Sequence, residues 1–258
     1  MDLGIKGKTA IVCASSKGLG FGCAKALAQA GVNLIICSRG EGDLLKATQS
    51  LLSLGVDVAP IVCDITSEEG QQKVLEAGAG ADILVTNSGG PPPGHWSEWK
   101  KEDILSAIDS NMLTPINLIQ NLLPGMIKKE WGRVVNITSQ SVKAPIQALG
   151  LSNTARSGLT GYVAGVSRQV APSGVTINNL LPGSHDTDRI RSLNKSESLS
   201  RNIAYEEVEK AGKSLIPAGR YGTVDEFGAI CAFLCSNHAG FIVGQNILVD
   251  GGNVNSTF

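Results

Sequence analysis

The sequence predicts an α/β fold in which helices cover both faces of a doubly wound, seven-stranded parallel sheet. Two observations predict it: short apolar runs alternate with helical patterns to the end of the chain, and a glycine-rich turn follows the first run. Short continuous apolar runs are typical of parallel strands buried on both faces, and each parallel crossover needs a connection such as a helix. A length of 258 residues fits one domain of this kind, spanning 1–258.

The elements follow in order along the chain. Strands are expected at 8–13, 33–38, 57–62, 81–86, 132–138, 174–180 and 245–249. Helices are expected near 18–30, 42–54, 67–78, 101–129, 152–171 and 223–235. Capping-box spacing predicts two of the helix starts, at Thr66 with Glu69 and at Thr223 with Glu226.

Residues 9–39 read as strand, glycine turn, helix and strand, which is the opening unit of a dinucleotide-binding Rossmann fold. Gly18 and Gly20 let the backbone come close to a pyrophosphate, whose charge is favoured at the N-terminus of a helix. A glycine turn kept only for packing is the alternative. The pattern favours nucleotide binding.

Composition excludes several classes of partner. The net charge is −1 and the isoelectric point is about 6.3, which gives no reason to expect nucleic acid or an anionic membrane as a partner. No apolar run approaches a membrane span, and no metal-ligand constellation is visible, so no metal is expected. The six cysteines form no Cys-x-x-Cys pair and no secretory leader is visible, so we expect reduced thiols in a cytoplasmic protein.

Two segments interrupt the alternation. Residues 89–94 form a stiff glycine–proline turn directly after a strand, and residues 184–216 are polar. A polar insertion of this length at the carboxyl end of a strand is a candidate substrate lid or loop. The alternative is a mobile surface excursion that takes no part in chemistry.

Taken in order, these pieces resemble the short-chain dehydrogenase/reductase family along essentially the whole chain, and within it the 3-oxoacyl-acyl-carrier-protein reductase type. The family's glycine turn corresponds to residues 14–20, its Asn-Ala-Gly element to 87–89, and the strand ending in its catalytic serine to 132–139. Its C-terminal signature corresponds to 216–220 and 244–252. The resemblance implies an oxidoreductase that interconverts a carbonyl and an alcohol, with a small-molecule substrate and a dimeric or tetrameric assembly.

The resemblance also implies a set of cofactor-binding residues. Asp64 stands where the family contacts adenine, and Pro182, Gly183 and Thr187 stand where it holds the nicotinamide carboxamide. Ala14 replaces the family's first glycine, and its methyl group is expected to alter the backbone of the turn only slightly. The implied set is Ala14, Ser16, Lys17, Gly18, Leu19, Gly20, Ser38, Arg39, Asp64, Ile65, Asn87, Ser88, Gly89, Arg156, Pro182, Gly183 and Thr187.

The catalytic positions depart from the family. Ser139 and Asn111 match its serine and asparagine, but its Tyr-x-x-x-Lys helix here carries Ser152 and Arg156, four residues apart on one helix face. In the family the tyrosine transfers a proton to or from the substrate oxygen, and the lysine lowers the pKa of that tyrosine and binds the ribose. Arg156 retains the charge for gripping a ribose, but an arginine stays protonated, and the Ser152 hydroxyl is a far weaker acid than a phenol.

No tyrosine takes over by register, since the chain has them only at 162, 205 and 221. Three interpretations stay open: a reductase with another donor, such as a water ordered by Ser139, Ser152 and Asn111; a reductase whose substrate supplies the relay; or a nucleotide-binding protein without redox turnover. Because Ser139, Asn111, Asn87 and the polar lid segment are all present, we favour an enzyme.

The residues after the second strand indicate which cofactor is preferred. NAD-binding sites of this type carry an acidic residue there, whereas this chain reads Cys37-Ser38-Arg39. Arg39 and Lys17 are placed to flank a 2′-phosphate, and Ser38 adds a hydroxyl, which favours NADP(H) over NAD(H). The alternative is that both are ordinary surface cations.

Two histidines are candidates for acid–base work, because an imidazole titrates near neutral pH. His95 follows the proline turn, and His185 begins the lid segment. A structural role is favoured for each, and His185 is the better candidate because it follows Pro182 and Gly183 so closely.

Overall fold

All seven predicted strands form one parallel sheet in the computed structural model, which describes residues 1–257. Their order is β3-β2-β1-β4-β5-β6-β7, so the direction of winding reverses between β1 and β4. Such a reversal opens a crevice at the carboxyl ends of the strands. The strands are β1 (Thr9–Val12), β2 (Asn33–Ser38), β3 (Val58–Val62), β4 (Ile83–Thr86), β5 (Gly132–Ile137), β6 (Val175–Pro182) and β7 (Asn246–Val249).

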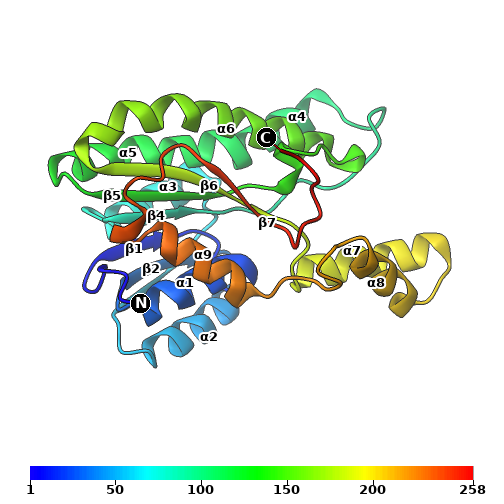
Figure 1. The fold of residues 1–258 in the computed structure, drawn as a ribbon, viewed down its shortest axis with the longest axis horizontal. Coiled ribbons are helices and arrows are strands. Elements are labelled where there is room, and N and C mark those ends of the chain that lie inside the picture. Colours follow the sequence, from blue (N-terminus) through cyan, green and yellow to red (C-terminus); the bar gives the residue numbers. More distant parts are fainter. Residues whose placement is uncertain (258) are drawn as a thin grey trace.

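Helices cover both faces of this sheet (Figure 1). One layer contains α1 (Gly18–Gln29), α2 (Glu41–Leu52) and α9 (Val224–Leu234), and the other contains α3 (Glu68–Ala77), α5 (Thr114–Lys128) and α6 (Gly150–Val170). Each layer has its own apolar cluster against the sheet: Leu27 and Phe227 are fully buried in the first, and Leu118 and Val163 in the second. The predicted doubly wound fold is therefore confirmed.

The helical pattern at 101–129 is not one helix. It comprises α4 (Lys101–Ile108), a π-helical segment (Asp109–Leu113) and α5. The wider turn includes Asn111, which is buried and donates from Nδ2 to the carbonyl oxygen of Gly89 at 3.4 Å. A single π-helical turn of this kind is rare and is found mostly at functional sites.

One predicted helix start is displaced by a residue. Thr66 does not cap α3, because its hydroxyl donates to the Asp64 carboxylate at 2.8 Å. Ser67 caps the helix instead and accepts from the Gly70 amide at 3.0 Å. The capping box of Thr223 with Glu226 is confirmed at the start of α9.

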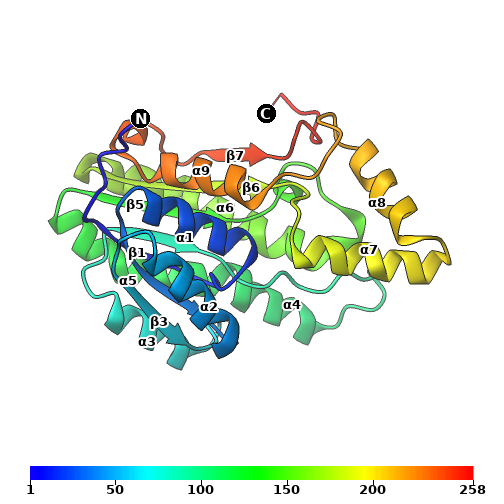
Figure 2. The same ribbon diagram turned by 90° about the horizontal axis from the view of Figure 1, so that it is seen from below.

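The polar segment 184–216 is helical rather than a loop. It forms α7 (Asp188–Arg201) and α8 (Tyr205–Ser214), which project beyond both layers in Figures 1 and 2. The start of this segment pairs with the chain that follows it, at a parallel bridge between His185 and Gly222. There the Asp186 amide donates to the Gly222 carbonyl at 2.8 Å. None of the helices in residues 1–257 is long and apolar enough to cross a membrane.

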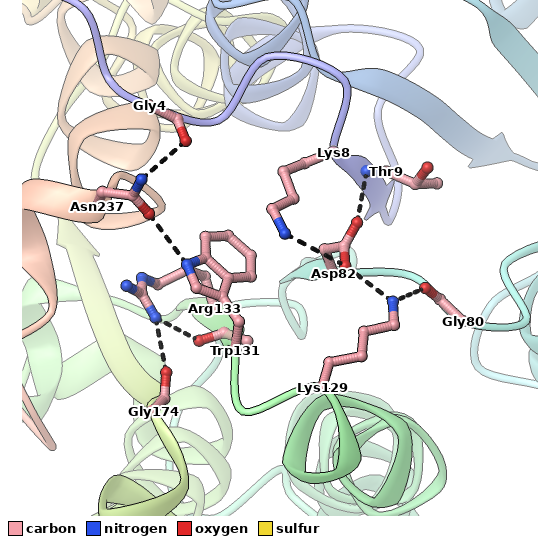
Figure 3. A network of polar contacts seen from close by, with 11 residues as sticks. Gly4, Lys8, Thr9, Gly80, Asp82, Lys129, Trp131, Arg133, Gly174 and Asn237 are labelled. Carbon is pink, nitrogen blue, oxygen red and sulfur yellow. Dashed lines mark hydrogen bonds and ion pairs between the residues drawn. The ribbon is translucent and has the colours of Figure 1, made fainter.

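Side-chain contacts close the amino edge of the sheet (Figure 3). The Asp82 carboxylate accepts from the Thr9 amide at 3.0 Å and pairs with Lys129 at 2.8 Å. Arg133 is buried and donates to the Gly174 carbonyl at 3.0 Å. These contacts leave the carboxyl edge as the open side of the sheet.

Two glycines set the distance between α1 and α9. A Cβ atom on Gly228 would lie 2.2 Å from the Gly22 carbonyl oxygen, which is shorter than any allowed contact. We therefore expect Gly228→Ala to lower the free energy of unfolding by about 1–3 kcal/mol, the usual cost of overpacking. Urea denaturation followed by circular dichroism measures it.

Gly161→Ala is the matched control, because this glycine lies within α6 and a Cβ there meets nothing within 4 Å. It should leave stability unchanged or raise it by up to about 1 kcal/mol. Equal unfolding curves for the two variants would contradict the glycine contact between the helices.

Candidate active site

A cleft of about 810 Å³ lies at the carboxyl edge, where the strand order reverses. Its size is typical of sites that bury most of a cofactor-sized ligand. Of the predicted cofactor residues, Gly20, Arg156, Pro182 and Gly183 do not line it. Those that do are Ala14, Ser16, Lys17, Gly18, Leu19, Ser38, Arg39, Asp64, Ile65, Asn87, Ser88, Gly89 and Thr187.

The glycine turn has a tight and partly strained backbone. Ala14 adopts φ +46°, in the left-handed region that costs an L-residue about 1–2 kcal/mol. Its carbonyl oxygen accepts from Asn87 Nδ2 at 3.2 Å, which ties the turn to the end of β4. A Cβ on Gly20 would lie 2.4 Å from that same oxygen. Gly20 is thus required by the close approach of the backbone within the turn.

Two cations stand at the outer end of the cleft, and their surroundings differ. Lys17 forms ion pairs with Asp188 at 3.2 Å and with Asp43 at 3.9 Å. Arg39 forms no ion pair with the described residues. Hydrogen bonds from Thr66, together with the charge of Arg39, lower the pKa of Asp64. Among the described residues, Lys17 is therefore ion-paired with carboxylates and Arg39 is not.

Ser152 and Arg156 lie on one face of α6, as their spacing predicted. Arg156 Nε donates to Ser152 Oγ at 3.1 Å, and Nη1 donates to the Ile137 carbonyl oxygen at 2.8 Å. Burial, with the Arg189 guanidinium nearby, lowers the pKa of Arg156 to about 10. That pKa is still well above neutral, so the guanidinium is a buried positive charge at physiological pH.

A small cavity adjoins the cleft at this point. Arg156, Asn111 and Ser88 line it, and its volume of about 10 Å³ is close to the room that one water needs. Ser88 Oγ donates to the Ser110 carbonyl at 2.9 Å, which binds the π-helical segment to the end of β4. The structure thus brings Asn111 and Arg156 together around one cavity.

Ser139 stands apart from that cavity. It follows the end of β5, is half-buried, and its hydroxyl oxygen accepts from the Ser141 amide at 3.1 Å. This bond uses the oxygen and leaves the hydroxyl proton free to be donated. Ile137, two residues earlier, accepts from Arg156, so the end of β5 holds both groups.

The two histidines lie outside the cleft. His185 is buried, with Nδ1 3.2 Å from the Gly183 carbonyl oxygen and its ring edge-on to Phe227. Burial lowers the pKa of His185, against smaller opposing effects from Gly183, Glu226 and Asp250. His95 is exposed, and its Nδ1 lies 2.7 Å from Ser97 Oγ.

Sequence reasoning missed one residue of the cleft wall that matters for its chemistry. Arg189, in the first turn of α7, lies against the glycine–proline turn, 3.4 Å from the Gly90 carbonyl and 3.3 Å from the Pro91 carbonyl. Its position two residues after Thr187 was the available signal. Only the folded chain shows that this arginine lines the cleft.

Comparison with known proteins agrees with this architecture. A family profile described as Enoyl-(Acyl carrier protein) reductase matches residues 13–253. The chain is 32% identical over 254 residues to the 3-oxoacyl-[acyl-carrier-protein] reductase of Vibrio harveyi, covering 97% of this chain and 98% of that protein. It is 30% identical to the D-beta-hydroxybutyrate dehydrogenase of Cupriavidus necator, covering 96% and 98%.

Solved structures agree as well. The L-sorbose reductase of Gluconobacter frateurii, complexed with NADPH and L-sorbose, superposes with a TM-score of 0.94 at 26% identity, over 99% of this chain and 100% of that one. A 3-oxoacyl (acyl-carrier-protein) reductase of Agrobacterium tumefaciens with NADP bound gives 0.87 at 27% identity, over 97% and 96%. The fold and cleft define a Rossmann-type oxidoreductase scaffold. The chain belongs to the short-chain dehydrogenase/reductase family.

The buried His185 predicts a pH dependence of stability. Its pKa is lower in the folded chain than in the unfolded chain, so below the unfolded value of about 6.5 the unfolded state binds a proton that the folded state resists. Stability should therefore fall as the pH drops from 7 towards 5. His185→Asn, which keeps a polar group near Gly183, should make that fall shallower in urea unfolding measured across this range.

His95→Asn serves as the control, because its ring is exposed in the folded chain. It should reproduce the slope of the unmodified protein. The same slope in His185→Asn would contradict the proposed protonation penalty.

Proposed function

We propose that the protein is an NADP(H)-dependent oxidoreductase that interconverts a carbonyl and an alcohol through an atypical proton relay. The observation that carries the proposal is the 810 Å³ cleft at the reversal of strand order, lined by the glycine turn, Arg39 and Thr187. Its place and its size fit a dinucleotide. The family to which the chain belongs supports redox chemistry between carbonyls and alcohols.

Several of the chain's groups would hold the cofactor. The turn at Gly18 and the N-terminus of α1 present backbone amides to the pyrophosphate. Asp64 would contact the adenine and Thr187 the carboxamide, as the family resemblance implies. Arg156 would grip the ribose next to the nicotinamide, whose ring exchanges a hydride with the substrate when bound. Arg39 supplies the charge for a 2′-phosphate.

The proton relay in this proposal uses hydroxyls and a fixed charge. Ser139 donates its free proton to the substrate oxygen, since its own oxygen already accepts from Ser141. Arg156 remains protonated and so stabilises negative charge on the substrate oxygen without carrying the proton itself. Solvent water would return a proton to the half-buried Ser139, in place of the phenol that the family uses.

A binding protein without redox turnover is the second candidate. Ser152 favours it, because its hydroxyl, which accepts from Arg156 at the position of the family's tyrosine, is a far weaker acid than a phenol. The kinetic test below separates the two candidates.

The cofactor preference gives the first test. NADPH should bind more tightly than NADH, and Arg39→Ala should remove about 1.5–3 kcal/mol of NADPH affinity by deleting charge-assisted contacts, with little change for NADH. Lys46→Ala is the control, because it removes the same charge. Lys46 is exposed on α2 and does not line the cleft. Isothermal titration calorimetry measures both, and equal affinities for the two cofactors in the unmodified protein would exclude the assignment.

The catalytic assignment gives the second test. Ser139→Ala should reduce turnover by about 10²-fold while leaving cofactor affinity nearly unchanged, because a positioned proton donor contributes that much. Arg156→Ala should weaken NADPH binding by about 1.5–3 kcal/mol for each charged hydrogen bond lost. Spectrophotometry of NADPH with a panel of carbonyl compounds measures turnover.

Two outcomes would contradict parts of this proposal. NADPH binding without turnover of any carbonyl or alcohol would favour the binding protein. Unchanged NADPH affinity in Arg156→Ala would show that Ser152 and Arg156 do not occupy the positions of the family's tyrosine and lysine.

We also infer a homotetramer in the cytoplasm. Phe241 is fully exposed just before β7, and Ile230 is partly exposed on α9, which fits an apolar contact between copies. All six cysteines are free thiols, and most are buried, which fits a reducing compartment.

A further inference from the structure

Several basic side chains of the α7–α8 projection are paired with carboxylates. Arg191 pairs with Asp186 at 2.8 Å and with Asp188 at 3.1 Å. Further along, Arg201 pairs with Glu197. Arg189 forms no ion pair with the described residues, and its partners are the carbonyl oxygens of Gly90 and Pro91 at 3.3–3.4 Å.

Arg156, like Arg189, has no carboxylate partner among residues 1–257. Its Nε and Nη1 donate to Ser152 and to the Ile137 carbonyl. Nη2 has no hydrogen-bond partner among residues 1–257. Burial lowers the pKa of Arg156, and the charge of Arg189, which lines the cleft, lowers it further. Two like charges in a partly buried site repel each other. An anion bound between them would attract both.

The acidic groups around the cleft are engaged elsewhere. Asp43 and Asp188 pair with Lys17, and Asp64 accepts from Thr66. Asp103 accepts from the Lys100 amide at the start of α4. Among residues 1–257 no carboxylate forms an ion pair with either arginine.

We infer that the substrate carries a carboxylate beside its carbonyl group, and that Arg189 is the specificity-determining residue that binds it. This inference rests on the proposed function. A guanidinium matches a carboxylate with two parallel hydrogen bonds, which are stronger than the long contacts that Arg189 makes with the two carbonyls. The substrate class is an oxo acid or the corresponding hydroxy acid.

The pyrophosphate of the cofactor is the other anion that Arg189 could meet. The glycine turn and the amides at the start of α1 already form a site for that group. Arg189 instead contacts the turn that follows β4, on the other wall of the cleft. Its position thus favours the substrate.

The test uses matched pairs of substrates with the full-length protein and NADPH. Pyruvate, acetoacetate and 4-oxopentanoate are each compared with their methyl esters, both in turnover and in calorimetric titration of the protein saturated with NADP⁺. The unmodified protein should prefer at least one acid over its ester in kcat/KM and in Kd. Arg189→Ala should reduce that preference about 10- to 100-fold, and Arg189→Lys should reduce it less, since the charge stays while the fork is lost.

Arg191→Ala is the control on the same helix, because its guanidinium already pairs with two carboxylates, and it should leave the preference unchanged. NADPH affinity is measured for every variant. A loss of NADPH affinity in Arg189→Ala with equal losses for acid and ester would assign the arginine to the pyrophosphate and overturn the inference. Normal NADPH binding without any preference for acids would overturn only the inference about the carboxylate. Absence of NADPH binding would overturn the proposed function as well.

Discussion

The parallel pairing of seven strands is the constraint on which the rest of this molecule depends. It brings every carboxyl strand end to one edge, and the reversal of order between β1 and β4 separates the helices that would otherwise cover that edge. The amino edge is closed by Asp82 and Arg133 with their partners. The glycine turn, residues 87–92 after β4 and the start of α7 therefore meet at a single cleft.

Arg156, in the small cavity that adjoins the cleft, is a buried charge that is costly to keep. A charged side chain removed from water is destabilising unless hydrogen bonds and opposite charges compensate for it. Ser152 and the Ile137 carbonyl compensate in part, but no carboxylate of the described residues does so. A position that retains an uncompensated charge fits a role in binding an anionic or polar ligand better than a role in stability.

The α7–α8 projection is tied to both walls of the cleft by weak contacts. Asp188 pairs with Lys17 of the glycine turn, and Arg189 contacts the carbonyls of the glycine–proline turn. Exposed ion pairs contribute about 0.2–1 kcal/mol each, and long hydrogen bonds contribute little more. The contacts between the projection and the walls of the cleft are therefore weak.

The sequence by itself predicted the seven strands of a doubly wound sheet and helices on both of its faces, because apolar runs and glycine turns are local patterns. It also placed Ser152 and Arg156 on one face, since helical spacing is a local property. Hydrogen bonds and packing, which periodicity does not encode, decided three other features. These are the π-helical turn at Asn111, the cap at Ser67 and the helices within residues 184–216. Only the tertiary structure placed Arg189 in the cleft wall against the glycine–proline turn, because the lining of a site depends on which distant segments meet there.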